Sequence, residues 1–153
     1  MAVVAVDDRS SVPVDEAALA AQAAFLMTEL GLHEDAELSI SLVDPEEMTD
    51  LHERWMDLPG ATDVLSFPMD ELRVPEAGEP AEPGVLGDVV ICPQVAAEQA
   101  AAAGHGPTAE LELLLTHGIL HLLGHDHAEP DEHAVMFGLQ DRLLARWRAR
   151  GEG

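Results

Sequence analysis

Stretches of alternating or continuous apolar residues predict four β-strands along the chain. Residues 37–43 place Leu and Ile at every second position against Glu and Ser, which is typical of a half-buried strand. Three further short apolar stretches have the length of a strand, at residues 3–6, 63–67 and 86–92. The segment 69–85 between the last two is rich in Pro, Gly and Glu without periodicity, and is therefore expected to be a mobile acidic loop.

Apolar residues at helical spacing predict about five helices. The first covers residues 14–30, with Asp15 as its cap and Gly31 as its end, and the second runs from Asp44-Pro45 to about residue 55. The others are expected over 93–103, over 107–124, and from 129 to the C-terminal arginines. Because helices and strands do not strictly alternate, we expect an α+β fold: one domain with a mixed sheet of about four strands and about five helices.

Length and composition narrow the class of protein. A chain of 153 residues, 47% of them apolar, suits a single domain with an aliphatic core. No apolar run has the length needed to cross a bilayer, so no membrane association is expected. A single cysteine, Cys92, suits a reducing compartment, and the expected location is the cytoplasm.

The charge of the chain is strongly acidic. The formal net charge is −23, and all seven basic residues are arginines. Such a surface repels phosphate backbones on average, which argues against bulk electrostatic binding of nucleic acid. Four of the arginines, however, crowd the last dozen residues: Arg142, Arg146, Arg148 and Arg150. This basic end is either a contact for RNA or an ordinary solvated helix end.

A cluster of histidines near residue 120 predicts a metal site. His117 and His121 are four residues apart, so on a helix they share one face. Gly124 can end that helix and reverse the chain, which would bring in His127 as a third ligand. Three imidazoles with an open fourth position are typical of catalytic zinc, although they also suit nickel, cobalt or iron. His125 is the rival third ligand, and helix-surface histidines are the alternative to a metal site.

The same spacing also fits the extended zinc motif of metalloproteases. Those enzymes need a glutamate directly after the first histidine as a base, and here that position is Gly118. A protease of this type would therefore lack its proton acceptor, unless Asp126 serves instead. The commoner role for Asp126 is to orient a ligating imidazole through a hydrogen bond.

Three sequence blocks resemble the YbeY family of bacterial endoribonucleases. Residues 117–127 read HGILHLLGHDH, which is similar to the family signature HGxLHLxGxDH. Residues 61–68, ATDVLSFP, resemble the family's PTDVLSFP stretch, and residues 86–92, LGDVVIC, resemble its LGDIVIS strand. The blocks occur in the family's order, and the resemblance covers essentially the whole chain.

The resemblance implies a YbeY-like metal-dependent hydrolase fold with zinc held by His117, His121 and His127. It also implies cleavage of single-stranded RNA, with maturation of the 16S rRNA 3′ end and ribosome quality control as the setting. The expected partners are then the 16S rRNA precursor and the small ribosomal subunit with its associated factors. None of this substrate information follows from composition or spacing.

One position departs from the family pattern. Many members carry an arginine just before the PTDVLSF block, where this chain has Met56. Arg54, two residues earlier, is our candidate for reaching the same cleft and holding phosphate. Two other functions remain open: a metal-dependent amidase or peptidase with Asp126 as base, and a non-catalytic ribosome-assembly factor stabilised by zinc.

Overall fold

The protein is described by a computed structural model that covers residues 2–70, 72–125 and 129–150. The strands are β1 (Val3–Asp8), β2 (Glu37–Leu42), β3 (Val64–Pro68) and β4 (Val85–Ile91). The helices are α1 (Glu16–Glu29), α2 (Pro45–Met56), α3 (Pro93–Ala103), α4 (Pro107–Leu122) and α5 (Pro130–Ala149). The predicted α+β fold with a four-stranded sheet and five helices is confirmed for these residues, with bounds that differ by a few residues at most.

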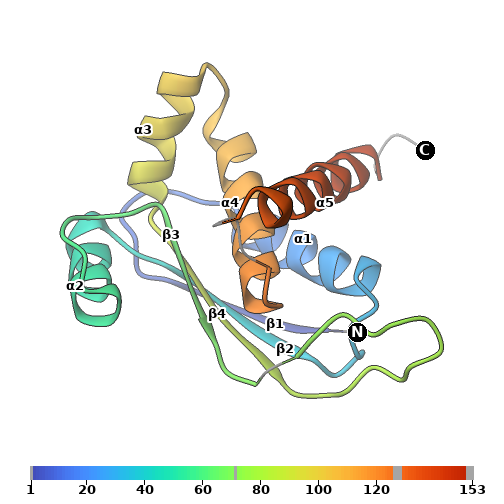
Figure 1. The fold of residues 1–153 in the computed structure, drawn as a ribbon. Coiled ribbons are helices and arrows are strands. Elements are labelled where there is room, and N and C mark those ends of the chain that lie inside the picture. The colour runs from blue at the N-terminus through green and yellow to red at the C-terminus, as the bar shows by residue number, and fades with distance from the viewer. Residues whose placement is uncertain (1, 71, 126–128, 151–153) are drawn as a thin grey trace.

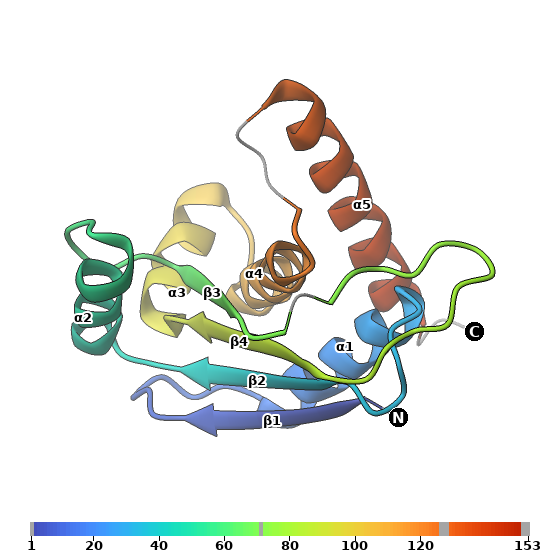
Figure 2. The same cartoon turned by 60° about the horizontal axis from the view of Figure 1, so that its bottom comes forward.

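The sheet has the strand order β1-β2-β4-β3. β2 pairs in parallel with β1 on one side and with β4 on the other, whereas β3 runs antiparallel to β4 and forms one edge. Helices α1, α3, α4 and α5 gather on one side of the sheet, and α2 lies apart from them near the ends of the strands (Figures 1 and 2).

Helix α4 lies at the centre of this arrangement. It packs against α1, α3 and α5 as well as against β3 and β4. Its central position explains why it is apolar on most sides, because a helix surrounded by other elements has few positions left for water. Leu115 and Leu120 are fully buried, and burial of each such side chain contributes about 1.5–3 kcal/mol.

The two faces of the sheet have separate cores because successive strand residues point in opposite directions. Val89 of β4 belongs to the main core beneath α4. Val90, the next residue, belongs to a smaller cluster with Met48 of α2 and Leu65 of β3. Strands β3 and β4 are therefore packed against α4 on one face, while α2 packs against part of the other face.

The two predicted aspartate caps behave differently. Asp15 caps α1 as expected, because its Oδ1 accepts a hydrogen bond from the Ala18 amide at 3.0 Å. Asp44 is the N-cap residue of α2, but its Oδ1 accepts hydrogen bonds from the Ser11 amide and hydroxyl, both at 2.9 Å. It therefore ties the loop after β1 to the start of α2.

The segment between β3 and β4 forms neither helix nor strand in its described residues, 69, 70 and 72–84. It extends away from the sheet in both views (Figures 1 and 2). Arg73 and Glu79 form an ion pair at 2.8 Å within it, and Asp70 accepts a hydrogen bond from the Val85 amide at 2.7 Å. Its mobility stays a prediction.

Membrane insertion was not expected from the sequence. Within the described ranges, no helix combines the length and the hydrophobicity that crossing a bilayer would require.

Candidate metal centre and cleft

The turn that follows α4 forms as the sequence predicts. Gly124 adopts a positive φ of 92°, a conformation that costs glycine little. Its amide donates to the His121 carbonyl at 3.0 Å, and the His125 amide donates to the Leu120 carbonyl at 3.1 Å. These are the two hydrogen bonds of a Schellman motif, which ends a helix and redirects the chain.

The two predicted helix ligands converge on one point. Nε2 of His117 and Nε2 of His121 lie 3.0 Å apart. Two imidazole nitrogens bound to one tetrahedral zinc at about 2.0–2.1 Å would be separated by roughly 3.3 Å. The observed separation is close to that value, so this donor pair fits zinc with a small adjustment of the rings.

The third predicted ligand, His127, and its neighbour Asp126 lie outside the described residues. Among the residues that are described, no group of three His, Cys, Asp or Glu side chains is placed to hold a metal ion. The roles of His127 and Asp126 therefore stay predictions.

A buried glutamine on α5 orients the first histidine. Oε1 of Gln140 accepts a hydrogen bond from Nδ1 of His117 at 2.9 Å, and the Gln140 residue is only 2% exposed. Because the amide oxygen can only accept, Nδ1 carries the proton, which leaves the lone pair of Nε2 facing His121. This is the tautomer that a metal-ligating histidine requires.

Sequence reasoning missed Gln140, although a signal was present. Gln140 occupies the buried stripe of α5 together with Met136, Leu143, Leu144 and Trp147. A lone amide at a core position of an amphipathic helix must find a polar partner, because burying it unpaired is costly. The stripe thus indicated a polar contact but not which residue supplied it.

A cleft of about 400 Å³ opens beside the two histidines. It is lined by Met56 of α2, by Asp63 and residues 64–66 of the edge strand, and by His117 and His121. The Ser66 hydroxyl donates to the Gly118 carbonyl at 3.0 Å, so it joins β3 to α4 at the floor of this cleft.

The position after His117 requires glycine because the helix approaches the sheet closely there. A Cβ atom on Gly118 would lie 2.7 Å from Cγ1 of Val89 and 3.3 Å from the Ser66 hydroxyl. A glutamate at this position would meet the sheet instead of pointing to the cleft. The packing of α4 therefore explains why the metalloprotease base is missing, and it weakens the amidase or peptidase hypothesis.

Asp63 is held firmly at the entrance of the edge strand. Its Oδ1 accepts a hydrogen bond from the Val64 amide at 2.7 Å. With the Gln99 amide oriented to satisfy both neighbours, its Nε2 donates to Asp63 Oδ2 at 3.0 Å and to Glu110 Oε1 at 3.2 Å. The other oxygen of Glu110 lies 2.5 Å from Nε2 of His105. This network fixes one wall of the cleft against α3 and α4.

The candidate arginine lies on the surface of α2. Arg54 forms an ion pair with Asp50, one turn earlier, with Nη2 and Oδ2 3.1 Å apart and both side chains exposed. Met56, at the position of the family arginine, is the α2 residue that lines the cleft. A catalytic role for Arg54 stays a prediction and would require this ion pair to break.

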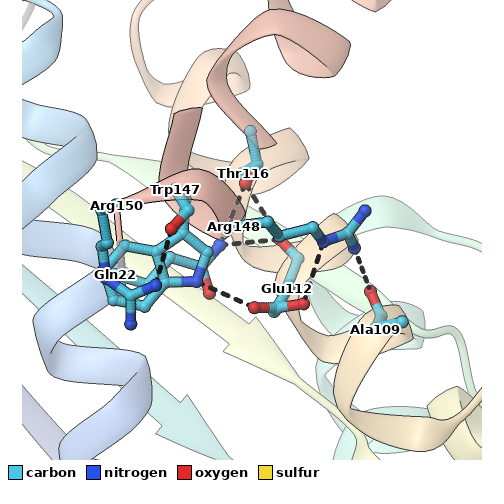
Figure 3. Close-up of polar contacts among 7 residues, drawn as sticks. All are labelled: Gln22, Ala109, Glu112, Thr116, Trp147, Arg148 and Arg150. Carbon is cyan, nitrogen blue, oxygen red and sulfur yellow. Dashed lines mark hydrogen bonds and ion pairs between the residues drawn. The ribbon is translucent and has the colours of Figure 1, made fainter. Parts of the chain in front are cut away.

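Two of the four C-terminal arginines, Arg146 and Arg148, are paired with acidic residues on neighbouring helices. Glu112 of α4 accepts hydrogen bonds from Trp147 Nε1 at 2.8 Å and from Arg148 Nε at 3.2 Å (Figure 3). Arg150 lies over the Trp147 ring, 3.1 Å from its centroid, and Arg146 pairs with Glu29 of α1 at 2.8 Å. These contacts anchor α5, which favours the interpretation as a helix end over an RNA contact.

Comparison with solved structures agrees with this fold. The solution structure of TM1509 from Thermotoga maritima superposes with a TM-score of 0.62 and covers 97% of this chain and 93% of that one. The two sequences are 24% identical, so this likeness concerns the fold alone.

Sequence comparisons give the family. Proteins named endoribonuclease YbeY from Thermobifida fusca and Beutenbergia cavernae are 63% and 62% identical to this chain. The alignments cover 94% of the chain in both cases, and 92% and 96% of those relatives. The profile of the family described as endoribonuclease YbeY matches residues 5–148. The chain therefore belongs to the YbeY family.

Proposed function

We propose that the protein is a zinc-dependent endoribonuclease that cuts single-stranded RNA and matures the 3′ end of 16S rRNA. The convergence of the His117 and His121 Nε2 atoms beside an open cleft carries this proposal. The endoribonuclease names of relatives more than 60% identical support the reaction class. The rRNA substrate, the small-subunit partners, ribosome quality control and a cytoplasmic location rest on the family resemblance.

In this mechanism His117, His121 and His127 would hold the metal. Zinc would supply a Lewis acid that makes the phosphodiester more susceptible to attack by water. Gln140 keeps the His117 proton on Nδ1 and so directs the Nε2 lone pair to the site. Asp63, held by the Val64 amide and Gln99, keeps the edge strand in place as the opposite wall.

Met56 limits what the cleft does with the substrate. Where many family members have a cation, this side chain contributes only apolar surface. Charge neutralisation at the scissile phosphate then falls mainly to the metal, unless Arg54 leaves Asp50. We therefore expect slow cleavage compared with family members that carry the arginine.

The test is cleavage of labelled single-stranded RNA by wild type and His121→Ala, with metal content determined on both proteins. His33→Ala is the matched control, because His33 lies in the α1–β2 loop and is absent from the lining of the cleft. We expect wild type and His33→Ala to retain zinc and cut RNA, and His121→Ala to lose both. Cleavage by metal-free His121→Ala would refute the mechanism. A zinc-loaded wild type that cuts no RNA would favour the assembly-factor function.

A further inference from the structure

A second hollow, of about 550 Å³, lies on the other face of the sheet from α4. Its position follows from strand alternation, since Val90 lines it whereas Val89 faces Gly118 of α4. Its apolar part comes from Leu51 and Trp55 of α2 and from Phe67 of β3. Asp88 and Val90 of β4 also line it, together with residues of β1 and β2 and with Arg9 and Glu47, and we call this hollow the Trp55 groove.

The groove exposes a large aromatic ring. Trp55 is 62% exposed, although burying a tryptophan would usually stabilise a fold. Its ring meets Phe67 edge to face, with centroids 6.3 Å apart and an interplanar angle of 72°. Phe67 therefore supports the indole from one side while much of its surface stays accessible. Supported, exposed aromatic rings are the surfaces on which unpaired nucleobases stack.

The Trp55 groove and the histidine cleft lie on the two sides of the edge strand β3. Trp55 and Met56 are consecutive in the last turn of α2, and the first lines the groove while the second lines the cleft. Ser66 and Phe67 are likewise consecutive in β3 and line the cleft and the groove respectively. An RNA strand that leaves the cleft around β3, at this edge of the sheet, would therefore enter the groove.

The charges around the groove favour a base over a phosphate. Arg9 is the one arginine among the lining residues of the groove. Its guanidinium already forms ion pairs with Asp7 and with Glu47, with Nη2 2.6 Å from Glu47 Oε2. Asp88 lies directly opposite Phe67 in the β3–β4 pairing, and no hydrogen-bond partner is found for its carboxylate among the described residues. A free carboxylate repels phosphate but accepts hydrogen bonds from amino groups of bases.

We propose that the Trp55 groove binds one unpaired nucleobase of the RNA, stacked on Trp55 and hydrogen-bonded to Asp88. This inference rests on the proposed function for the identity of the ligand. Adenine, guanine and cytosine carry exocyclic amino groups and suit Asp88, whereas uracil does not carry one. Because a paired base cannot enter, the groove also selects for single strands.

Tryptophan fluorescence tests the proposal directly. The chain has two tryptophans, and Trp147 is 4% exposed, so a short oligonucleotide quenches mainly Trp55 if it stacks there. The probes are hexamers of adenosine and of uridine, added to protein in the His121→Ala background so that cleavage does not interfere. We expect quenching by both hexamers, with tighter binding of the adenosine hexamer.

Substitutions assign the signal to the groove. Because the variants at Trp55 lack the reporting indole, their binding is followed by the fluorescence anisotropy of dye-labelled hexamers. Trp55→Ala should weaken binding about 5- to 150-fold, the range for loss of one base–aromatic stack, whereas Trp55→Phe should retain most of the affinity. Val135→Ala, which truncates another exposed apolar residue on α5, should leave binding unchanged. Asp88→Asn should remove the preference for adenosine. Affinity should not fall steeply with salt, since the groove holds no phosphate.

Two binding results would overturn the inference, as would RNA cleavage that Trp55→Ala leaves unchanged. One is equal binding by wild type, Trp55→Ala and Val135→Ala, which would leave the groove for a protein partner. The other is a steep loss of affinity with salt that Trp55→Ala shares. Quenching without any RNA cleavage by wild type would contradict the proposed function and leave the groove assignment standing. RNA cleavage that Trp55→Ala leaves unchanged would overturn the groove assignment and leave the proposed function standing.

Discussion

Replacing Gln140 by leucine isolates the role of the buried amide behind the metal site. The substitution keeps a side chain of similar size on α5 but removes the acceptor of the His117 Nδ1 proton, now 2.9 Å from Oε1. His117 can then shift its proton to Nε2, which must be unprotonated to bind a metal. The perturbation leaves every proposed metal ligand in the chain.

The expected magnitudes follow from these contacts. Loss of a hydrogen-bonding partner behind a ligating histidine typically weakens metal affinity 10- to 100-fold, or about 1.4–2.7 kcal/mol. The Nδ1 proton also loses its acceptor in a site where Gln140 is 2% exposed, which costs about 1–3 kcal/mol of folding stability. We therefore expect both zinc affinity and the free energy of unfolding to fall, by separable amounts.

Gln22→Leu is the matched control for stability. Gln22 is 1% exposed on α1, and its Nε2 donates to the Thr116 hydroxyl at 3.0 Å and to the Glu112 carbonyl at 2.8 Å. Its replacement should destabilise the fold similarly while leaving zinc affinity unchanged. The assays are competition with a chromogenic chelator for zinc and urea unfolding of the metal-free proteins. Equal zinc affinities for the two variants would refute the orienting role of Gln140.

Two further predictions follow from Met56 and from Gly118. Met56→Arg introduces a cation into the cleft and should raise the rate of RNA cleavage about tenfold, which corresponds to the low end of the free energy of a charged hydrogen bond. Arg54→Met should change the rate little. The reverse order of effects would assign phosphate binding to Arg54. Gly118→Ala should lower the free energy of unfolding by about 1–3 kcal/mol, because its Cβ would crowd Val89. Gly138→Ala on α5, where a Cβ meets nothing within 4 Å, should instead stabilise by about 0.5–1 kcal/mol, as urea unfolding can measure.

Local sequence patterns predicted the elements well because the signals they use are local. Alternation over 37–43 predicted β2, and the glycine at 124 predicted the end of α4, since both depend on neighbours in the chain. The strand order could not be predicted in this way. It places β4 between β2 and β3, so it depends on the pairing of β2 with β4, two strands that are not consecutive in the chain.

Contacts between distant residues account for what the sequence did not reveal. The spacing of His117 and His121 predicted their shared helix face, and their Nε2 atoms do converge. Gln140 lies 23 residues away from His117 and reaches it only through the packing of α5 on α4. The side chain of Asp44 was expected at a helix cap but binds Ser11, 33 residues away, because the loop after β1 offers it two donors.

The acidity of the chain constrains how it can hold RNA. A net charge of −23 gives no long-range attraction for phosphate. Of the four C-terminal arginines that were candidates for RNA contact, three already have partners on the protein. Affinity must then come from short-range terms, for which the proposed zinc site and the exposed indole of Trp55 are the candidates. Both act over a few ångströms and neither depends on a basic surface. On this argument, moderate salt should assist RNA binding by screening the repulsion, which is opposite to the behaviour of proteins that bind through phosphate contacts.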